Sequence, residues 1–444
     1  MLTCFRLPLF VGGLLAAAAF ALAEDPLAED AVLRSLVAEA LSRNPDLLAA
    51  QQAVAAARER VVQAGALPDP MLSVGYTNDG WSPSLGGQEM TTLALMASQD
   101  LPFPGKRRLR SDIASRETGR AEQQLERSRL RVVAEVKRAY HGLLLARDLL
   151  ALTWEQRETW REIEGVVRAR YAVGQGAQQD VLRVQVELTR VEERDAEQAA
   201  QAGIRLAELN RLLARPPDSP LETPATLVLR PLERSLSEAL AQAREVSPEL
   251  ASGRLAVERN RLAVSLARKE LKPDFTLQAG YMNRGGLDPM WQAGIGVRFP
   301  IYRKKRTAAV AEAEARTRGD ERLVDSLDLQ LRYRTQERVT RLKTSERIAA
   351  LYDKGIVPQD RMSVEAAIAN YQTGKVPFIT VLEALTTLYG DRWTYARLVA
   401  EHAQLLASLE EASLEPTAGM ASGDGRLPSA GIPSGAMGGG MSGQ

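Results

Sequence analysis

The chain has 444 residues, with 57 basic and 56 acidic side chains and a formal net charge of +1 at pH 7. This balance gives no reason to expect a nucleic-acid partner, since such surfaces need an excess of Lys and Arg. After the N-terminal segment no window approaches about 18 uninterrupted apolar residues, which excludes a transmembrane helix but leaves room for short strands of alternating polarity.

Residues 1–23 are predicted to be an export signal. Arg6 precedes an apolar segment, 7–22, and Ala21-Leu22-Ala23 provides a small-residue cleavage site. An uncleaved anchor is the alternative, but this segment is short for a membrane span. Cys4, the one cysteine of the sequence, lies before the apolar segment, so it cannot be an acylated lipoprotein terminus. Export without disulfides is compatible with a protein of a Gram-negative envelope.

The remaining sequence consists of two similar halves. The offset between matching positions stays between 198 and 205, which is far too long for a solenoid repeat, so each half is predicted to be a whole substructure. The matching pairs include Pro45-Asp46 with Pro248-Glu249, Pro68-Asp69 with Pro273-Asp274, Gly75-Tyr76 with Gly280-Tyr281, Lys106-Arg107-Arg108 with Lys304-Lys305-Arg306, and Tyr171 and Gly174 with Tyr371 and Gly374.

Each half opens with a predicted helix, 30–64 or 235–269, followed by one predicted β-hairpin. Strict period-2 alternation predicts strands at 70–78 and 91–100 in the first half and at 274–282 and 291–299 in the second. One face of each strand is apolar, and we expect this face to contact lipid. The residues assigned to it are Leu72, Val74, Tyr76, Phe275, Leu277, Tyr281, Trp291, Ile295 and Val297.

The third part of each half is the longest. Apolar residues at heptad spacing predict a helix over 105–170 with a return helix over 178–214, and a helix over 303–370, kinked at Pro358, with a return over 378–412. A continuous helix over 105–170 is about 100 Å long at ~1.5 Å per residue. The heptad stripe, which includes Val136, Tyr140 and Trp154, must be buried on other helices, so the sequence predicts a coiled-coil-like assembly.

These elements divide the chain into a first repeat, 24–215, a proline-rich ordered connector, 216–232, and a second repeat, 233–414. Residues 415–444 are predicted to be a disordered Gly/Ser/Met tail. Its methionines, Met420, Met437 and Met441, are soft-metal donors by type, but three of them scattered through such a segment are more often inert.

Four strands cannot close a membrane barrel, for which eight is about the minimum, and open sheet edges are not tolerated in lipid. Chains must therefore pool their strands: two chains supply eight and three supply twelve. The unpartnered stripes of the long helices impose the same demand, which a closed symmetric ring satisfies.

The order helix, hairpin, very long helix, tight tip and return helix, present twice, resembles the TolC family of outer-membrane efflux ducts. The tips carry the most specific likeness: residues 170–182 and 370–383 are similar to the family's Tyr/Phe-x-x-Gly-x-x-x-x-x-Asp-Val pattern at its periplasmic helix turns. The resemblance implies a mainly α fold with a small β part, and a homotrimer with a 12-stranded transmembrane β-barrel and a periplasmic α-helical barrel.

The resemblance also implies a gate at the tips. Asp180 and Tyr371 match the family's aspartate and tyrosine, whereas the family's arginine position is Val376, with Lys375 beside it. Thr380 and Glu383 stand at the positions of an acidic ring. The alternative for Asp180 is a helix-capping role, and Glu383 is alternatively a solvated surface acid. Residues assigned to docking a periplasmic adaptor are Tyr171, Gly174, Val181, Leu182, Gly374, Val381 and Leu382.

No catalytic motif, cofactor or metal site is predicted. His141 and His402 have no second ligand at metal-binding spacing and are expected to pack between helices. The resemblance favours the outer-membrane channel of a tripartite efflux system for small toxic compounds or heavy-metal ions. Its expected partners are an adaptor (membrane fusion) protein, an inner-membrane transporter of the RND type and outer-membrane lipid. Two alternatives stay open: a type I protein-secretion duct, and a structural coiled-coil protein of the periplasm.

Overall fold

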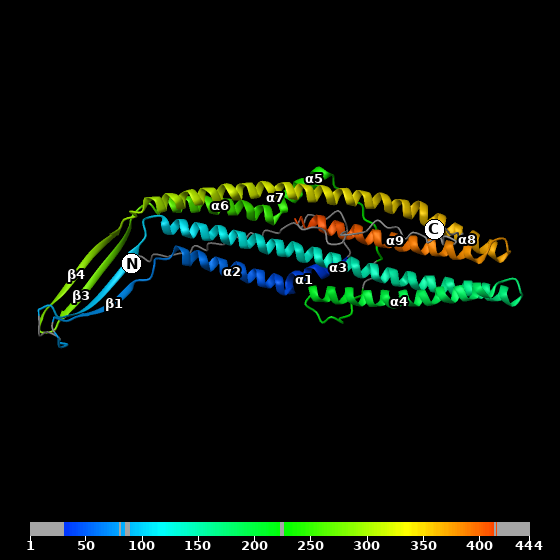
Figure 1. Cartoon of the computed structure of the whole chain (residues 1–444), viewed down its shortest axis with the longest axis horizontal. Coiled ribbons are helices and arrows are strands. Elements are labelled where there is room, and N and C mark those ends of the chain that lie inside the picture. Colours follow the sequence, from blue (N-terminus) through cyan, green and yellow to red (C-terminus); the bar gives the residue numbers. More distant parts are fainter. Residues whose placement is uncertain (1–30, 80, 85–88, 223–225, 413, 415–444) are drawn as a thin grey trace, which may run out of the picture.

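A computed structural model of the chain describes residues 31–79, 81–84, 89–222, 226–412 and 414. The expected export signal and the expected Gly/Ser/Met tail lie outside these residues. The described chain is elongated, with all four strands at one end and two helical tips at the other (Figure 1). Within the described ranges, no helix is both long and apolar enough to cross a membrane.

Two helices, rather than the predicted single one, open each half. In the first half α1 (Ala31–Arg43) ends before α2 (Pro45–Gly65), and in the second α5 (Leu236–Val246) ends before α6 (Pro248–Lys269). The prediction of continuous helices was wrong because each proline pushes the preceding residue out of the helical region. Asn44 and Ser247 are accordingly extended, and both cap the helix that follows by accepting backbone N–H bonds.

The four strands form one antiparallel sheet in the order β1-β2-β3-β4. They are β1 (Met71–Thr77), β2 (Thr92–Leu101), β3 (Asp274–Arg284) and β4 (Leu287–Arg298), so the hairpins of the two halves are joined through β2 and β3. β4 begins earlier than predicted because the turn after β3 is tight: Gly285 has a positive φ of 68° and donates to Asn283 Oδ1. Pro289 is compatible with this longer strand because β4 is an edge strand.

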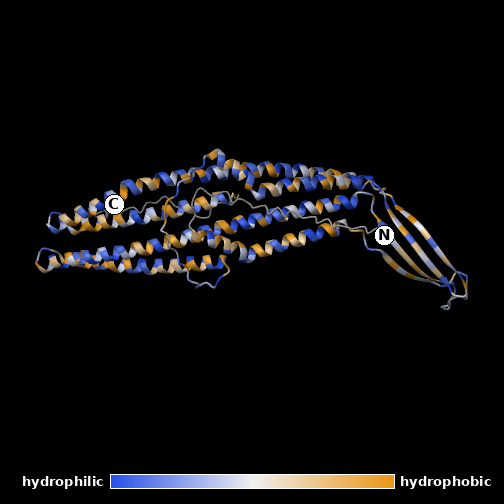
Figure 2. Ribbon diagram, turned by 180° about the vertical axis from the view of Figure 1, so that it is seen from behind, coloured by the Kyte–Doolittle hydropathy of each residue, from blue (hydrophilic) through white to orange (hydrophobic). Residues whose placement is uncertain are grey.

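The two hairpins have the same register. Val74 pairs with Leu95, and their repeat counterparts Ala279 and Ala293 also pair. Because directly opposed residues of antiparallel strands share a face, the register places the nine residues expected to contact lipid on one face of the sheet. The other face consists mostly of small and polar residues, among them Ser73, Gly75, Gln278, Gly280 and Gly294. Figure 2 shows the sheet extending beyond the helices, with hydrophobic residues recurring along its strands.

The long helices run away from the sheet. In the first half α3 (Lys106–Ala172) is uninterrupted and returns through α4 (Gln178–Leu212). In the second half α7 (Arg303–Leu351) passes into a π-helical turn (Tyr352–Ile356), then α8 (Val357–Gln372) and the return helix α9 (Phe378–Glu410). Pro358 lies just after the π-turn and cannot donate a backbone N–H, which explains why the irregularity precedes the proline at which we expected a kink.

Two buried clusters hold the long helices together. One joins α1, α3 and α4 around Val136, Tyr140 and Leu143. The other lies near the tips and joins α3 and α4 to α8 and α9 around Trp160, Val184, Phe378 and Leu385. Trp154 does not follow the predicted stripe, because its side chain is 61% exposed in the single chain.

The connector crosses both halves and is fixed through its backbone. Leu227 N donates to Asp148 of α3 (3.2 Å) and Leu232 N donates to Glu346 of α7 (2.6 Å). His402 of α9 bonds the carbonyl oxygen of Arg230 through Nε2 (2.7 Å). The described part of the connector therefore ties α3 to α7 and α9.

Candidate gate and docking site at the helical tips

The two tips have the same backbone conformation. Gly174 and Gly374 both have φ = 75°, a region that favours glycine, and both donate to the carbonyl oxygen of the tyrosine three residues earlier at 3.0 Å. The next residue donates its backbone N–H to the carbonyl oxygen five residues earlier, from Gln175 to Arg170 and from Lys375 to Asn370, at 2.9 Å in both tips. The sequence repeat at the tips therefore encodes one turn used twice.

The side chains around the two turns differ. Tyr371 is buried, 4% exposed, and its ring packs edge-to-face against Phe378 with 5.5 Å between centroids. Arg170, from the first tip, stacks over the same ring with its Cζ 4.5 Å from the centroid. Arg170 also donates from Nη2 to the carbonyl oxygen of Gln175 (3.1 Å). Arg170 and Tyr371 therefore join the first tip to the second.

Asp180, in the first turn of α4, also acts on Tyr371. Burial and the negative charge of Asp180 raise the pKa of the Tyr371 hydroxyl above its ordinary value, while the cation of Arg170 works in the opposite direction. The hydroxyl therefore stays protonated at neutral pH. The structure thus brings together the two residues, Asp180 and Tyr371, that the sequence placed at the gate.

Three other predicted gate residues lie outside this cluster. Lys375 and Glu383 are exposed, and Thr380 is half-buried with its backbone N–H bonded to the carbonyl oxygen of Pro377 (3.1 Å). Val376, at the family's arginine position, packs against the buried cluster near the tips. In the single chain Lys375 and Glu383 are thus open to solvent, whereas Val376 contacts the core.

The predicted docking residues divide by exposure. Tyr171 and Leu182 are 48% and 54% exposed, and both turn glycines are exposed. Val181 and Leu382 are half-buried against the cluster near the tips. Val381 is 1% exposed, so assigning it to adaptor contact was wrong: it is a core residue that supports the turn from inside.

Sequence reasoning missed the contact of Arg170 with Tyr371. The family's pattern places a cation on the second tip, whereas the guanidinium that stacks on Tyr371 comes from the first. The repeat carries a signal here, because Arg170 corresponds to Asn370 and the tips therefore differ in charge immediately before the tyrosine.

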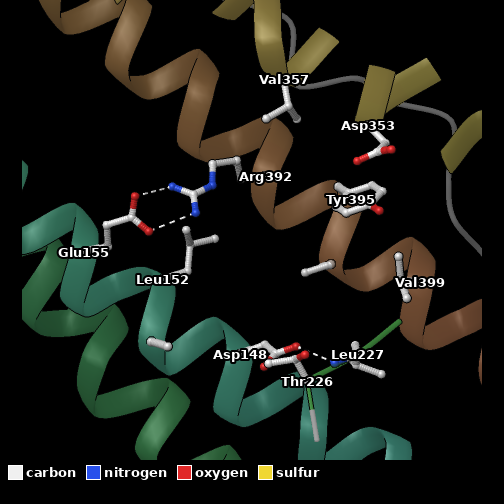
Figure 3. A pocket seen from close by; sticks show the side chains of 12 residues that line it. Asp148, Leu152, Glu155, Thr226, Leu227, Asp353, Val357, Arg392, Tyr395 and Val399 are labelled. Atoms are coloured by element: carbon white, nitrogen blue, oxygen red, sulfur yellow. Dashed lines mark hydrogen bonds and ion pairs between the residues drawn. The ribbon is translucent and has the colours of Figure 1, made fainter. Parts of the chain in front are cut away.

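Two further side-chain bonds join the same helices behind the tip. Thr159 Oγ lies 2.7 Å from the Tyr389 hydroxyl, and Arg392 forms a bidentate ion pair with Glu155 at 2.6 and 2.9 Å (Figure 3). With Arg170 and Tyr371, they connect α3 to α8 and α9 over about 20 Å of helix at ~1.5 Å per residue.

A cavity of about 360 Å³ lies between α3, the π-turn, α9 and the connector (Figure 3). Asp148 lines it, and burial raises the pKa of that carboxyl above its ordinary value. Tyr395 lines it as well, and burial together with the charge of Asp353 raises the pKa of its hydroxyl. In the part of the chain that the structure describes, no group of three or more His, Cys, Asp or Glu is placed to hold a metal ion.

His402 packs between helices, as expected, whereas the ring contact of His141 is with its own neighbour in α3. His402 is 1% exposed and bonds Ser345 Oγ through Nδ1 (2.8 Å), besides the carbonyl oxygen of Arg230. Burial lowers its pKa below the ordinary value, so it is neutral at pH 7. His141 packs edge-to-face on Tyr140, with 5.7 Å between ring centroids.

Comparison with known proteins agrees with this architecture. The chain is 24% identical over 386 residues to the cobalt-zinc-cadmium resistance protein CzcC of Cupriavidus metallidurans, covering 85% of this chain and 88% of CzcC. The solved structure of CusC is similar with a TM-score of 0.72 at 20% identity, covering 86% of this chain and 92% of CusC. The outer membrane protein VceC of Vibrio cholerae gives a TM-score of 0.73 at 21% identity, covering 86% and 95%.

The family comparison is specific. Residues 36–215 and 239–413 each match the family described as Outer membrane efflux protein, one match for each repeat. The resemblance to TolC-type efflux ducts is thereby confirmed. Because the two matches together span most of the sequence, the chain belongs to the outer membrane efflux protein family.

Proposed function

We propose that this protein is the passive outer-membrane duct of a tripartite efflux system and has no catalytic site. The observation that carries the proposal is the register of the sheet. It gathers nine apolar side chains on one face, at the end of the molecule opposite two long helical tips. Eight of the nine side chains, all but Phe275, are at least 40% exposed in a single chain, which suits a lipid contact.

The working form is proposed to be a homotrimer. Both outer strands of the sheet, β1 and β4, have an unpaired edge in one chain, and a lipid-embedded sheet cannot leave such edges open. Three copies supply twelve strands for one closed barrel, and their helices supply a tunnel through the periplasm. A periplasmic scaffold that never enters lipid would need another layer over the apolar face, which the described chain does not provide.

The gate is proposed to be held by Asp180, Tyr371 and Arg170. The cation–π contact of Arg170 and the charge of Asp180 both reach Tyr371 from the first tip, so separating the tips removes both. The entrance surface of the duct is proposed to carry Lys375, Thr380 and Glu383, outside the Arg170–Tyr371 contact. The periplasmic adaptor is proposed to bind the tips and to link the duct to an RND-type transporter. The residues proposed to contact it are Tyr171, Gly174, Val181, Leu182, Gly374 and Leu382.

Heavy-metal ions are the cargo we propose, with small toxic compounds as the wider class, because CzcC is named for cobalt, zinc and cadmium resistance. The test is a deletion strain of the host organism. Sensitivity of this strain to cobalt, zinc or cadmium supports metal export if expression of the chain restores tolerance. Sensitivity confined to dyes and antibiotics supports the wider class. Loss of a secreted protein with unchanged tolerance would replace the proposal with the type I secretion duct.

A further inference from the structure

The repeat predicts how two copies of this chain meet. At the sheet end of one chain, the first half contacts the second through β2, β3 and the start of α3. In a ring, the second half of each copy must contact the first half of the next. Since the halves share one fold, the seam seen inside the chain is a template for the seam between chains. The following inference rests on the trimer proposed above.

A buried ion pair marks the seam inside the chain. Lys106 is 1% exposed, and its Nζ lies 2.8 Å from Asp274 and 3.2 Å from Glu270. Asp274 also accepts the backbone N–H of Phe103 at 2.7 Å. A buried lysine is retained only where carboxylates face it, so this pair fixes how β2 and β3 enter the helical part.

Both members of this pair recur in the repeat. Lys304 is the counterpart of Lys106, and Asp69 is the counterpart of Asp274. In the single chain both side chains are exposed, because each lies beside an outer strand. Phe299 and Ile301 behave in the same way: they are 67% and 73% exposed, whereas their counterparts Leu101 and Phe103 are half-buried.

Several other contacts of charged residues across the internal seam do not recur. Arg127 and Glu249 lie 3.2 Å apart, but their counterparts are Asp325 and Asp46, two acids that cannot pair. Glu270 corresponds to Gly65. The recurrence of Lys106 and Asp274 is therefore not a general consequence of duplication.

We propose that Lys304 of one copy pairs with Asp69 of the next, and that β4 pairs with β1 of that copy in the register of β2 and β3. Adding 205 to the number of a β1 residue gives its counterpart in β3, and adding 198 to the number of a β2 residue gives its counterpart in β4. Applied to the β1–β2 pairs, these two offsets give the observed β3–β4 pairs. Applied to the observed β2–β3 pairs, they place Ala293 opposite Tyr76, Ile295 opposite Val74 and Val297 opposite Leu72. The apolar face then continues from one copy to the next without a step.

The register is tested by oxidative cross-linking in a Cys4→Ser background. Directly opposed Cα atoms are about 4.5–5.5 Å apart and diagonal ones about 7–8 Å, so only opposed cysteines fall in disulfide range. Val74→Cys with Ile295→Cys is expected to give a covalent trimer without reductant. Val74→Cys with Val297→Cys, two residues out of register, is the matched control and is expected to remain mostly unlinked.

A disulfide inside one chain does not explain the expected band, because β1 and β4 are separated by β2 and β3, about 14 Å at ~4.8 Å per strand. The register is overturned if the control pair links better, or if neither pair links in a detergent particle that contains three chains. In both cases the trimeric duct stands. A particle of one chain overturns both the register and the proposed assembly.

Charge exchange tests the ion pair. Asp69→Lys and Lys304→Asp are each expected to lower the temperature at which the trimer dissociates, and the double exchange is expected to restore it. The matched control combines Asp69→Lys with Arg303→Asp. Arg303 corresponds to Gly105, which has no side chain to form an ion pair, so this combination is not expected to restore the temperature. Equal rescue by the control combination, or no rescue by the exchanged pair, overturns the assigned partners.

Discussion

The guanidinium of Arg170 lies over the ring of Tyr371, 4.5 Å from Cζ to the ring centroid, and joins the first helical tip to the second. These residues are separated by the whole length of a repeat, and the charge of Asp180, on α4, raises the pKa of the Tyr371 hydroxyl. The contact between the tips thus depends on a cation–π contact and a buried tyrosine more than on exposed ion pairs, whose contribution is small in water.

Arg170→Ala is expected to loosen the tip. A cation–π contact of this kind is worth about 0.5–2 kcal/mol, which favours the open tip by roughly two- to thirtyfold. Cells that carry the variant should become more permeable to a large antibiotic that the outer membrane normally excludes. Arg168→Ala is the control, because Arg168 pairs with Glu164 of its own helix and its side chain is 59% exposed. Equal leakage from both variants would remove Arg170 from the gate.

Gly374 can be changed so that turn geometry and docking surface are separated. Alanine at φ = 75° costs about 1–2 kcal/mol, and its Cβ would also lie 3.4 Å from Arg170 Nη2. Gly374→Ala should therefore reduce both tip stability and export. Gly374→Asn tolerates the left-handed conformation better but adds bulk on the outside. Loss of export in Gly374→Asn with an intact trimer would support adaptor docking at this turn, and full export would argue against it.

The two faces of the sheet should respond differently to charge. Val74→Arg places a cation on the face proposed to contact lipid, where the cost is about 2–4 kcal/mol near the bilayer midplane. Ser73→Arg, one residue earlier, places the same cation on the other face. Recovery of each variant in outer-membrane fractions measures the difference. The assignment of faces is reversed if Ser73→Arg is lost and Val74→Arg assembles normally.

His402 should make the helical part sensitive to acid. Burial lowers its pKa, so as pH falls below the ordinary value of 6.5 the unfolded chain takes up a proton before the folded chain does. The free energy of unfolding therefore falls as pH drops from 6.5 toward the folded-state pKa. His402→Gln should flatten this part of the profile of melting temperature against pH. An unchanged slope in His402→Gln would show that another group is responsible.

Asp148 should give the free energy of unfolding a pH dependence of the opposite sign. Burial raises the pKa of this carboxyl, so the folded chain holds the proton at pH values where the unfolded chain has released it. Stability is therefore lost as pH rises from the ordinary value of 3.8 through the folded-state pKa. Asp148→Asn keeps an oxygen for the N–H of Leu227 and removes this loss, so it should be as stable as the unmodified chain at neutral pH or more stable.

Asp148→Ala is the contrasting variant. It removes the acceptor and leaves the N–H of Leu227 unpaired, which costs about 1–3 kcal/mol where the group stays buried. Chemical denaturation of the two variants separates the effect of the charge from the effect of the hydrogen bond. Equal stability of Asn and Ala at position 148 would show that this hydrogen bond does not hold the connector.

Much of the fold could be predicted because the duplication repeats each signal. The alternation in β1 and β2 recurs in β3 and β4, and the shared register follows from two fixed offsets. Local signals fixed the helix starts as well, since α4 begins at Gln178 and α9 at Phe378, where the return helices were expected. The breaks at Asn44 and Ser247 had a local signal in the following prolines, which the prediction of one continuous helix in each half did not use.

Contacts between the halves could not be predicted in this way. Arg170 reaches Tyr371, and His402 reaches Arg230, only because the fold brings together segments that are distant in sequence. The π-turn at Tyr352–Ile356 likewise has no counterpart in α3, so the repeat gave no indication of it. Val381 was misassigned because its match to Val181 suggested equal exposure, whereas the second tip packs more deeply.

The central claim is that three chains form one outer-membrane duct. The most direct test is the protein mass of the particle extracted from outer-membrane fractions, corrected for bound detergent. The account predicts the mass of three processed chains in a particle that precipitates when detergent is removed. A particle of one or two chains that stays soluble without detergent would contradict it, because the apolar face of the sheet would then never have entered lipid.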